Sequence, residues 1–158
     1  MQNEPVKVAV NDEALRLDNQ LCFPLYAASH MIIRLYRPVL DPLGLTYTQY
    51  ITLLALWERD DVTVKELGER LYLDSGTLTP LLKKLEAHGI VERERDSADE
   101  RSVRIRLTES GTALKSQAAE VPSKVASCID LPREDALELH RLLHALLADS
   151  GTVKCATS

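Results

Sequence analysis

Two short helix signals in close succession constrain this chain more than any other feature of its sequence. They lie in "TVKELGERLYLDSGTLTPLLKKLEAHG", residues 63–89. Thr63 and Glu66 have the spacing of a capping box, which predicts a helix over 64–71. The apolar repeat resumes after "YLD" and stops at Gly89, a residue type that favours the turn after a helix. Two short helices therefore flank a tight link.

The second of these helices has two different sides. Asp74 or Ser75 can cap its start. One side is predicted to be buried and consists of Leu78, Leu81, Leu82 and Leu85. The opposite side is small or basic and consists of Gly76, Thr79, Pro80, Lys83 and Ala87, with Lys84 at the border. Pro80 removes one helical hydrogen bond, so either the helix tolerates it near its first turn or the helix begins at Thr79 with Pro80 at N1.

The next segment, "IVERERDSADERSVRIRL" at 90–107, changes to a two-residue alternation. Val103, Ile105 and Leu107 fall on one side, and Arg104 and Arg106 fall on the other. The "DSADE" stretch supplies a turn between the two halves. This pattern predicts a charged β-hairpin.

Two short helices, a tight turn and a basic hairpin are the parts of a winged helix-turn-helix module. Small residues and lysines on the outer side of a helix can approach base edges and meet phosphates. A solvated amphipathic helix would show the same pattern, and the hairpin decides in favour of DNA. The hairpin arginines that suit phosphate contact are Arg93, Arg95, Arg101, Arg104 and Arg106. Arg101, near the tip, is placed to enter a minor groove.

The rest of the chain is predicted to be helical, so the fold class is mainly α with a small β part (α+β). A Leu-rich sequence with 4% aromatic residues favours helices over a β-sandwich. The additional helices are predicted over 18–37, where Pro38 ends the pattern, and over 46–59, 109–129 and 132–150.

The 158 residues are predicted to form one unit with two regions. Residues 46–108 make the DNA-binding region, and 13–45 with 109–150 make a helical region. The first and last helices carry more apolar side chains than one small module covers, which predicts a homodimer.

The net charge of −5 hides an uneven distribution of charged residues. Residues 1–74 carry a net −4 and residues 108–158 a net −2, whereas 75–107 carry seven basic and six acidic residues, a net +1. The segment predicted to contact DNA is therefore the only one that is not acidic.

Three cysteines in a chain of this size do not suggest a secreted disulfide framework. The sequence also contains no apolar run that predicts a signal peptide or a membrane span. We therefore expect a cytoplasmic protein that has no membrane partner.

Cys22 lies in an apolar stretch, "NQLCFPLY", and has two interpretations. A free cysteine often fills a core as a small hydrophobe. With Asp18 as the N-cap, however, Cys22 would lie about one turn into the first helix, where the dipole and free amides favour a thiolate. Tyr36 follows 14 residues later on that helix, roughly 21 Å along its axis at about 1.5 Å per residue. If the two side chains meet, they meet across an antiparallel dimer.

Several segments resemble a known family. The stretch from "TVKELGERLYLDSG" to "RSVRIRLTESG" resembles the MarR family of dimeric winged-helix regulators. Within that family, "LCFPLYAASH", "LTYTQYITLLALWE" and "LYLDSGTLTPLLKKLE" resemble the organic hydroperoxide sensors called OhrR. The resemblance covers residues 15–149.

This resemblance implies a repressor of palindromic operator DNA. The helix from Ser75 would read the major groove, and Asp99 and Arg101 would form the Asp-x-Arg of the wing tip. Together with the pattern above, the predicted DNA-binding residues are Ser75, Gly76, Thr77, Thr79, Pro80, Lys83, Lys84, Arg93, Arg95, Asp99 and Arg101.

The resemblance also implies a redox signal. Cys22 would be the sensing cysteine, hydrogen-bonded by Tyr36 and Tyr47 of the partner subunit. Organic hydroperoxide would oxidise it to a sulfenic acid. Cys128 matches the resolving cysteine of the two-cysteine subclass, which forms an intersubunit disulfide with the sensing cysteine. Cys155, in the tail, is expected to be a spectator.

Three alternatives stay open. A thiol peroxidase would use the same Cys22, but the sequence has no Cys-x-x-Cys reductase motif, so an enzyme is not expected. A regulator released by non-covalent binding of a phenolic or lipophilic effector would need no reactive thiol. His140 and His144, one turn apart, suggest a metal sensor, but histidines at this spacing are more often surface residues. No cofactor and no metal are expected.

Overall fold

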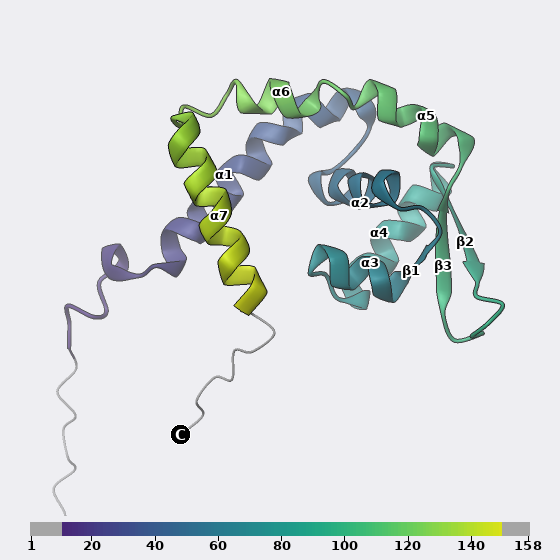
Figure 1. The fold of residues 1–158 in the computed structure, drawn as a ribbon, viewed down its shortest axis with the longest axis horizontal. Helices are drawn as coiled ribbons and strands as arrows, with labels where there is room; N and C mark the ends of the chain where they lie inside the picture. The colour runs from purple at the N-terminus through teal and green to yellow at the C-terminus, as the bar shows by residue number, and fades with distance from the viewer. Residues whose placement is uncertain (1–10, 150–158) are drawn as a thin grey trace, which may run out of the picture.

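A computed structural model describes residues 11–149 of the chain (Figure 1). The α-helices are α1 Cys22–Leu40, α2 Tyr47–Glu58, α3 Val64–Leu71, α4 Ser75–Ala87, α5 Glu109–Gln117, α6 Val121–Ala126 and α7 Arg133–Asp149. Two short 3-10 helices are η1 Leu17–Asn19 and η2 Asp41–Leu43. The strands are β1 Val62–Thr63, β2 Val91–Arg95 and β3 Val103–Leu107.

The helices and strands lie in two parts of the molecule. Helices α2, α3 and α4 lie together with the sheet, and the β2–β3 hairpin projects from that group (Figure 1). Helix α6 packs against α1 and, with α5, bridges to the sheet side. The mainly α fold with a winged helix-turn-helix is as the sequence predicted.

The helix-turn-helix begins with the predicted capping box. The Glu66 amide donates to Thr63 Oγ1 at 3.1 Å, and the Thr63 amide donates to Glu66 Oε2 at 2.8 Å. Helix α3 then spans 64–71, as predicted. Helix α4 is capped by Asp74, so of the two candidate caps it is the aspartate that accepts the Thr77 amide.

Helix α4 continues through Pro80, which decides between the two interpretations of its start. A proline here removes the hydrogen bond that would reach Gly76, an exposed residue whose carbonyl can bind water instead. The predicted row of leucines is buried: Leu78, Leu81, Leu82 and Leu85. Gly89, with φ of 69°, ends the helix in the left-handed conformation.

The hairpin belongs to a three-stranded antiparallel sheet in the order β1-β3-β2. Val91 pairs with Leu107 and Arg95 with Val103, while Val62 of β1 pairs with Ile105. The predicted two-stranded hairpin is therefore incomplete. Strand β1 has two residues, too few for any alternation to show in the sequence.

Helix α1 differs from its predicted bounds at both ends. Asp18 lies in the separate turn η1 and does not cap α1, so Cys22 is its first residue. Pro24 falls in the first turn, where a missing amide costs no helical hydrogen bond. Pro38 lies inside the helix, which continues to Leu40. Leu40 is buried in the core and holds this last turn in place.

The helix predicted over 109–129 is two helices, α5 and α6, separated by residues 118–120. Pro122 lies in the first turn of α6, where its fixed φ favours a helix start and its missing amide is not needed. Helix α7 then starts directly after Pro132, whose carbonyl accepts the Ala136 amide. None of the helices within residues 11–149 combines the length and the apolar character that a membrane span requires.

Gly111, near the start of α5, marks a close approach between α5 and the sheet. Its carbonyl accepts Trp57 Nε1 at 3.0 Å, which ties α5 to α2. A Cβ at this position would collide with the Ile90 carbonyl oxygen and lie 3.2 Å from Leu107 Cδ2. The Ile90 carbonyl belongs to the backbone, so it cannot move aside at as low a cost in free energy as the end of a flexible side chain could.

Gly111→Ala is therefore expected to destabilise the fold by about 1–3 kcal/mol, even though alanine favours helices. Thermal unfolding followed by circular dichroism measures this. Ser110→Ala, one residue earlier and exposed, is the matched control and should leave the midpoint nearly unchanged. Equal midpoints for both variants would contradict the close approach.

Candidate nucleic-acid interface and thiol site

The outward side of α4 consists of residues that the sequence predicted to read DNA. Gly76, Thr77, Pro80, Lys83 and Lys84 are exposed with Ser75, and Thr79 is half-buried. Asp74 caps the helix through the Thr77 amide at 2.9 Å, and this bond lowers the pKa of Asp74. The helix start is thus fixed, and Lys83 and Lys84 follow a little more than two turns later.

The wing places Arg101 on an exposed loop between β2 and β3. Asp99 shapes this loop, since its carboxylate accepts the Arg101 amide at 3.0 Å and the Ser102 hydroxyl at 3.0 Å. Arg95 is exposed at the end of β2. Arg93 forms an ion pair within the protein, because its Nη1 lies 3.4 Å from Glu86 Oε2 of α4, and is therefore less available to DNA than Arg95 or Arg101.

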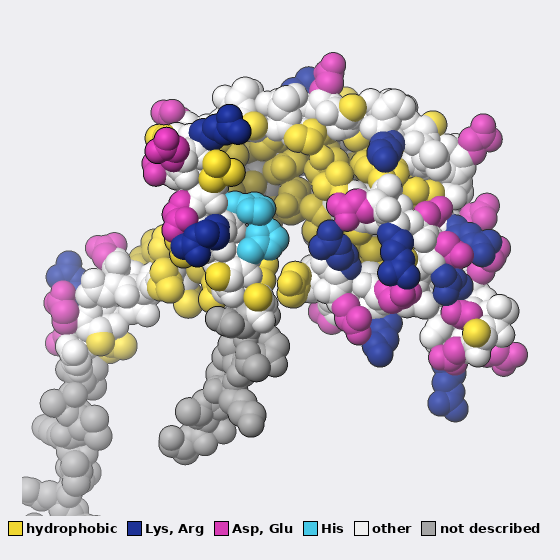
Figure 2. Space-filling view, viewed as in Figure 1, with side chains coloured by type: hydrophobic (Ala, Val, Ile, Leu, Met, Phe, Trp, Pro, Cys, Tyr) yellow, Lys and Arg dark blue, Asp and Glu magenta, His cyan; other side chains and the backbone are white. Residues whose placement is uncertain are grey.

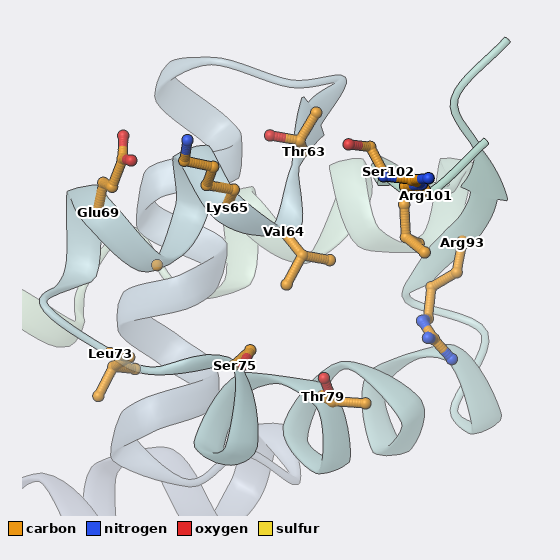
Figure 3. A pocket seen from close by; sticks show the side chains of 12 residues that line it. Thr63, Val64, Lys65, Glu69, Leu73, Ser75, Thr79, Arg93, Arg101 and Ser102 are labelled. Atoms are coloured by element: carbon orange, nitrogen blue, oxygen red, sulfur yellow. The ribbon is translucent and has the colours of Figure 1, made fainter. Parts of the chain in front are cut away.

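A hollow of about 470 Å³ separates α3, α4 and the wing (Figure 3). Thr63, Val64 and Lys65 line one side, Ser75 and Thr79 line the other, and Arg93 and Arg101 close one end. Lys65 was not among the predicted residues. The capping box could have indicated it, because a box at Thr63 puts Lys65 in the exposed first turn of α3.

Two wing arginines form ion pairs within the protein, which the sequence did not predict. Arg104 Nε donates to Asp61 Oδ1 at 2.8 Å, and Arg106 Nε lies 3.0 Å from the same oxygen. Hydrogen bonds from Arg106 and Arg104 lower the pKa of Asp61 to about 2. Their charges are compensated within the protein, and the contact of Arg104 and Arg106 with phosphates stays a prediction.

Cys22 is an exposed free thiol at the first residue of α1. Its apolar neighbours Leu21 and Phe23 are also exposed, with 75% and 39% of their surface accessible, and Leu25 is half-buried. The interpretation of Cys22 as a core filler is therefore wrong for the single chain. The thiol and its apolar neighbours face outward together.

Tyr36 and Tyr47 meet where the end of α1 packs on the start of α2. Their ring centroids are 4.8 Å apart, and Tyr50 lies 5.8 Å from Tyr36. Burial raises the pKa of Tyr47, and burial with the neighbouring Tyr47 and Tyr50 raises the pKa of Tyr36. Both hydroxyls therefore stay protonated at neutral pH and remain hydrogen-bond donors.

The thiol and the tyrosines lie at opposite ends of α1. The 14 residues from Cys22 to Tyr36 span about 21 Å at 1.5 Å per helical residue. The structure of one chain thus brings the two tyrosines together but keeps them away from Cys22.

Cys128 is the second free thiol and lies in the turn after α6. It is exposed, and its Sγ donates to the Lys124 carbonyl at 3.4 Å. Cys155 lies outside the described residues. On α7, His140 Nε2 and His144 Nε2 are 3.0 Å apart, but the described residues contain no cluster of three or more metal-ligating side chains.

Comparison with known proteins finds related transcriptional regulators. The family model described as transcriptional regulator SarA/Rot matches residues 34–118. The organic hydroperoxide resistance transcriptional regulator of Bacillus subtilis (strain 168) is 49% identical over 133 residues, which cover 84% of this chain and 90% of the relative.

Solved structures show the same fold. Reduced AbfR bound to DNA, a protein of Staphylococcus epidermidis, superposes with a TM-score of 0.72 at 38% identity and covers 88% of this chain and 97% of its own. The disulfide form of AbfR superposes with a TM-score of 0.60 at 39% identity, and the match covers 86% of this chain and 96% of the AbfR chain. Wild-type apo MarR from E. coli superposes with a TM-score of 0.63 at 27% identity, and the match covers 81% of this chain and 97% of the MarR chain.

The family model covers more than half of the chain, and the relatives and structural neighbours are transcriptional regulators rather than enzymes. This chain therefore belongs to the MarR and SarA/Rot type of winged-helix transcriptional regulators, and within that family it is of the organic hydroperoxide regulator type.

Proposed function

We propose that this protein is a homodimeric repressor that leaves its operator when an organic hydroperoxide oxidises Cys22. The observation that carries the proposal is the placement of an exposed thiol at the start of α1 and of two half-buried tyrosine donors, Tyr36 and Tyr47, at its other end. A second, antiparallel copy of α1 would bring the partner's tyrosines to Cys22. The role places the protein in the cytoplasm, where the operator is.

Exposed apolar surface on α1 and α7 supports the dimer. Residues 133–148 of α7 are exposed apart from Leu143, which is half-buried, and Leu137 and Leu142 have 61% and 50% of their surface accessible. Hydrophobic side chains also line the hollow between α7 and the DNA-binding part (Figure 2). Apolar surface of this extent is normally covered by a partner. Residues 13–45 and 109–150 are accordingly the proposed dimerisation region, and 46–108 the DNA-binding region.

The outward side of α4 and the wing supports operator binding. In a dimer, two copies of α4 would enter successive major grooves, about 34 Å apart, and so select a palindrome. Arg101 on each wing would reach the flanking minor groove. The proposed contact residues are those predicted from the sequence, with Lys65 added.

The proposed sensing step is a two-electron oxidation. The Cys22 thiolate attacks the terminal peroxide oxygen, the O–O bond breaks, and the alkoxide leaves as an alcohol after taking a proton. Tyr36 and Tyr47 of the partner would stabilise the thiolate and orient the peroxide. Leu21 and Phe23 would favour an organic oxidant over hydrogen peroxide.

Cys128 of the partner would then resolve the sulfenic acid. Its thiolate attacks the Cys22 sulfur, an S–S bond forms, and the hydroxyl leaves as water. A disulfide needs the two Cα atoms within about 7 Å, so the link would pull helices and change the spacing of the two α4 copies. Loss of that spacing would release the operator.

The alternative is release by a non-covalent phenolic or lipophilic effector. The hollow between α3, α4 and the wing favours it, because a ligand there would lie against Thr79 and Arg101 and compete with DNA. Such a regulator would respond to its effector without any change at Cys22.

Arg101→Ala is expected to weaken operator binding about tenfold, and to lower the slope of log Kd against log salt by about one, because it removes one cation from the DNA. Titration of a palindromic duplex, selected from a random pool by the wild-type protein, measures both quantities. Lys115→Ala removes an equal charge from α5 and should change neither. An unaltered Kd for Arg101→Ala would refute the placement of the wing.

Cys22→Ser should bind the same duplex in the absence of oxidant and should stay bound when cumene hydroperoxide is added, because serine cannot form a sulfenic acid. Electrophoretic mobility with graded peroxide, combined with intact mass, tests this. Cys155→Ser is the control and should respond like the wild type. Peroxide-induced release of Cys22→Ser would favour the effector-binding alternative.

Cys128→Ser should still be oxidised at Cys22 but should form no intersubunit disulfide. Non-reducing gels after peroxide treatment should show a crosslinked dimer for the wild type and a monomer band for the variant. A crosslink that persists in Cys128→Ser would mean that another thiol resolves the sulfenic acid.

A further inference from the structure

An ionic network joins the start of the helix-turn-helix to the base of the wing. Asp61 lies just before β1, and β1 leads directly into α3. Arg104 of β3 donates from Nε to Asp61 Oδ1 at 2.8 Å, and from Nη2 to the Asp61 carbonyl. Arg106 adds a second guanidinium to the same carboxylate, 3.0 Å from Oδ1. One aspartate thus holds two arginines of the wing.

The network continues to the residue that closes the wing loop. Arg104 Nη1 donates to Asp96 Oδ2 at 3.1 Å. The Asp96 amide donates to the Ser102 carbonyl at 2.9 Å, and its Oδ1 accepts the Ala98 amide at 2.9 Å. Asp96 therefore fixes both ends of the loop that carries Arg101.

We infer that Asp61 is a positioning residue for DNA recognition, which acts through Arg104 and Asp96 to set where Arg101 lies relative to α3 and α4. The inference rests on the proposed operator binding. Asp61 itself contacts no DNA in this scheme.

The backbone at Asp61 supports a specific role. Its φ of 56° lies in the left-handed region, which residues other than Gly, Asn and Asp rarely adopt. This conformation turns the chain from α2 into β1 and directs the Asp61 carbonyl and carboxylate at Arg104. Asp60 beside it accepts the Leu107 amide at 2.9 Å, so the turn is fastened to β3 as well.

The network is also partly shielded from solvent and stays charged. The Arg104 side chain is 32% exposed and the Asp96 side chain 14%. Hydrogen bonds from Arg106 and Arg104 hold the pKa of Asp61 at about 2, far below the pH of any DNA-binding assay. The positioning role of Asp61 is therefore tested by substitution rather than by a change of pH.

Positioning and simple electrostatics predict opposite effects. Removing a carboxylate near DNA makes the protein more positive, which by charge alone would tighten DNA binding. If Asp61 positions the wing, its loss weakens binding instead. The sign of the change separates the two explanations.

Asp61→Asn is the chosen variant, because asparagine keeps the size and tolerates the left-handed backbone while it loses the charge. Its Kd for the selected palindromic duplex should rise about fivefold, and its salt slope should fall toward that of Arg101→Ala. Glu100→Gln, the same charge change on the exposed wing loop, should bind as tightly as the wild type or more tightly.

A double-mutant cycle separates positioning from a general loss of stability. In an Arg101→Ala background, Asp61→Asn should cost less than about twofold in Kd, because the contact that it positions is already gone. Asp96→Asn, which cuts the network at its other end, serves as a second variant if Asp61→Asn fails to fold.

The outcomes are distinguishable. If the wild type selects no duplex, the proposed operator binding fails. If the wild type binds but Asp61→Asn and Asp96→Asn bind like Glu100→Gln, or if their losses add fully to that of Arg101→Ala, the positioning role is overturned while operator binding stands.

Discussion

The burial of four leucines on one side of α4 is the interaction on which the rest of the structure depends. Leu78, Leu82 and Leu85 have no accessible surface and Leu81 has 8%. Replacement of a buried leucine by alanine typically costs about 2–5 kcal/mol, so rotation of this helix about its axis is strongly opposed. The opposite side, with its lysines and small residues, is therefore held toward solvent. Val91 and Ile105 join the same cluster and anchor the wing beside it.

Local signals explain what could be predicted from the sequence. The capping box at Thr63, the cap at Asp74 and the row of leucines each involve residues within a few positions of one another. Their physical effect is complete within one helix, so α3 and α4 match the prediction. The tyrosines also follow this rule in part, since the end of α1 and the start of α2 are separated only by a short connection.

The features that could not be predicted depend on distant partners. Strand β1 exists because Val62 pairs with Ile105, 43 positions later. The alternation over 103–107 assigned Arg104 and Arg106 to the correct side of the strand. The sequence did not reveal that both arginines form ion pairs with Asp61 on that side. Helix α1 passes Pro38 because Leu40 is held in a core built from other segments. Residues 118–120, which separate α5 from α6, are good helix formers, so the sequence indicates the start of a new helix only through Pro122.

Helix α1 belongs to the proposed dimerisation region but packs at its end against the DNA-binding region, which suggests how a covalent step at its start would reach DNA. Its last residue, Leu40, is buried in the cluster that also holds the α4 leucines, while its first residue, Cys22, is exposed about 27 Å away at 1.5 Å per residue. A helix of this length behaves as a rigid body, so movement of its free end is transmitted to the end that is embedded. The proposed disulfide would pull on the free end, and the DNA-binding part would turn with the embedded end. The proposed sensing chemistry can then remain far from the DNA and still control binding, because one helix connects the thiol to the core of the DNA-binding region.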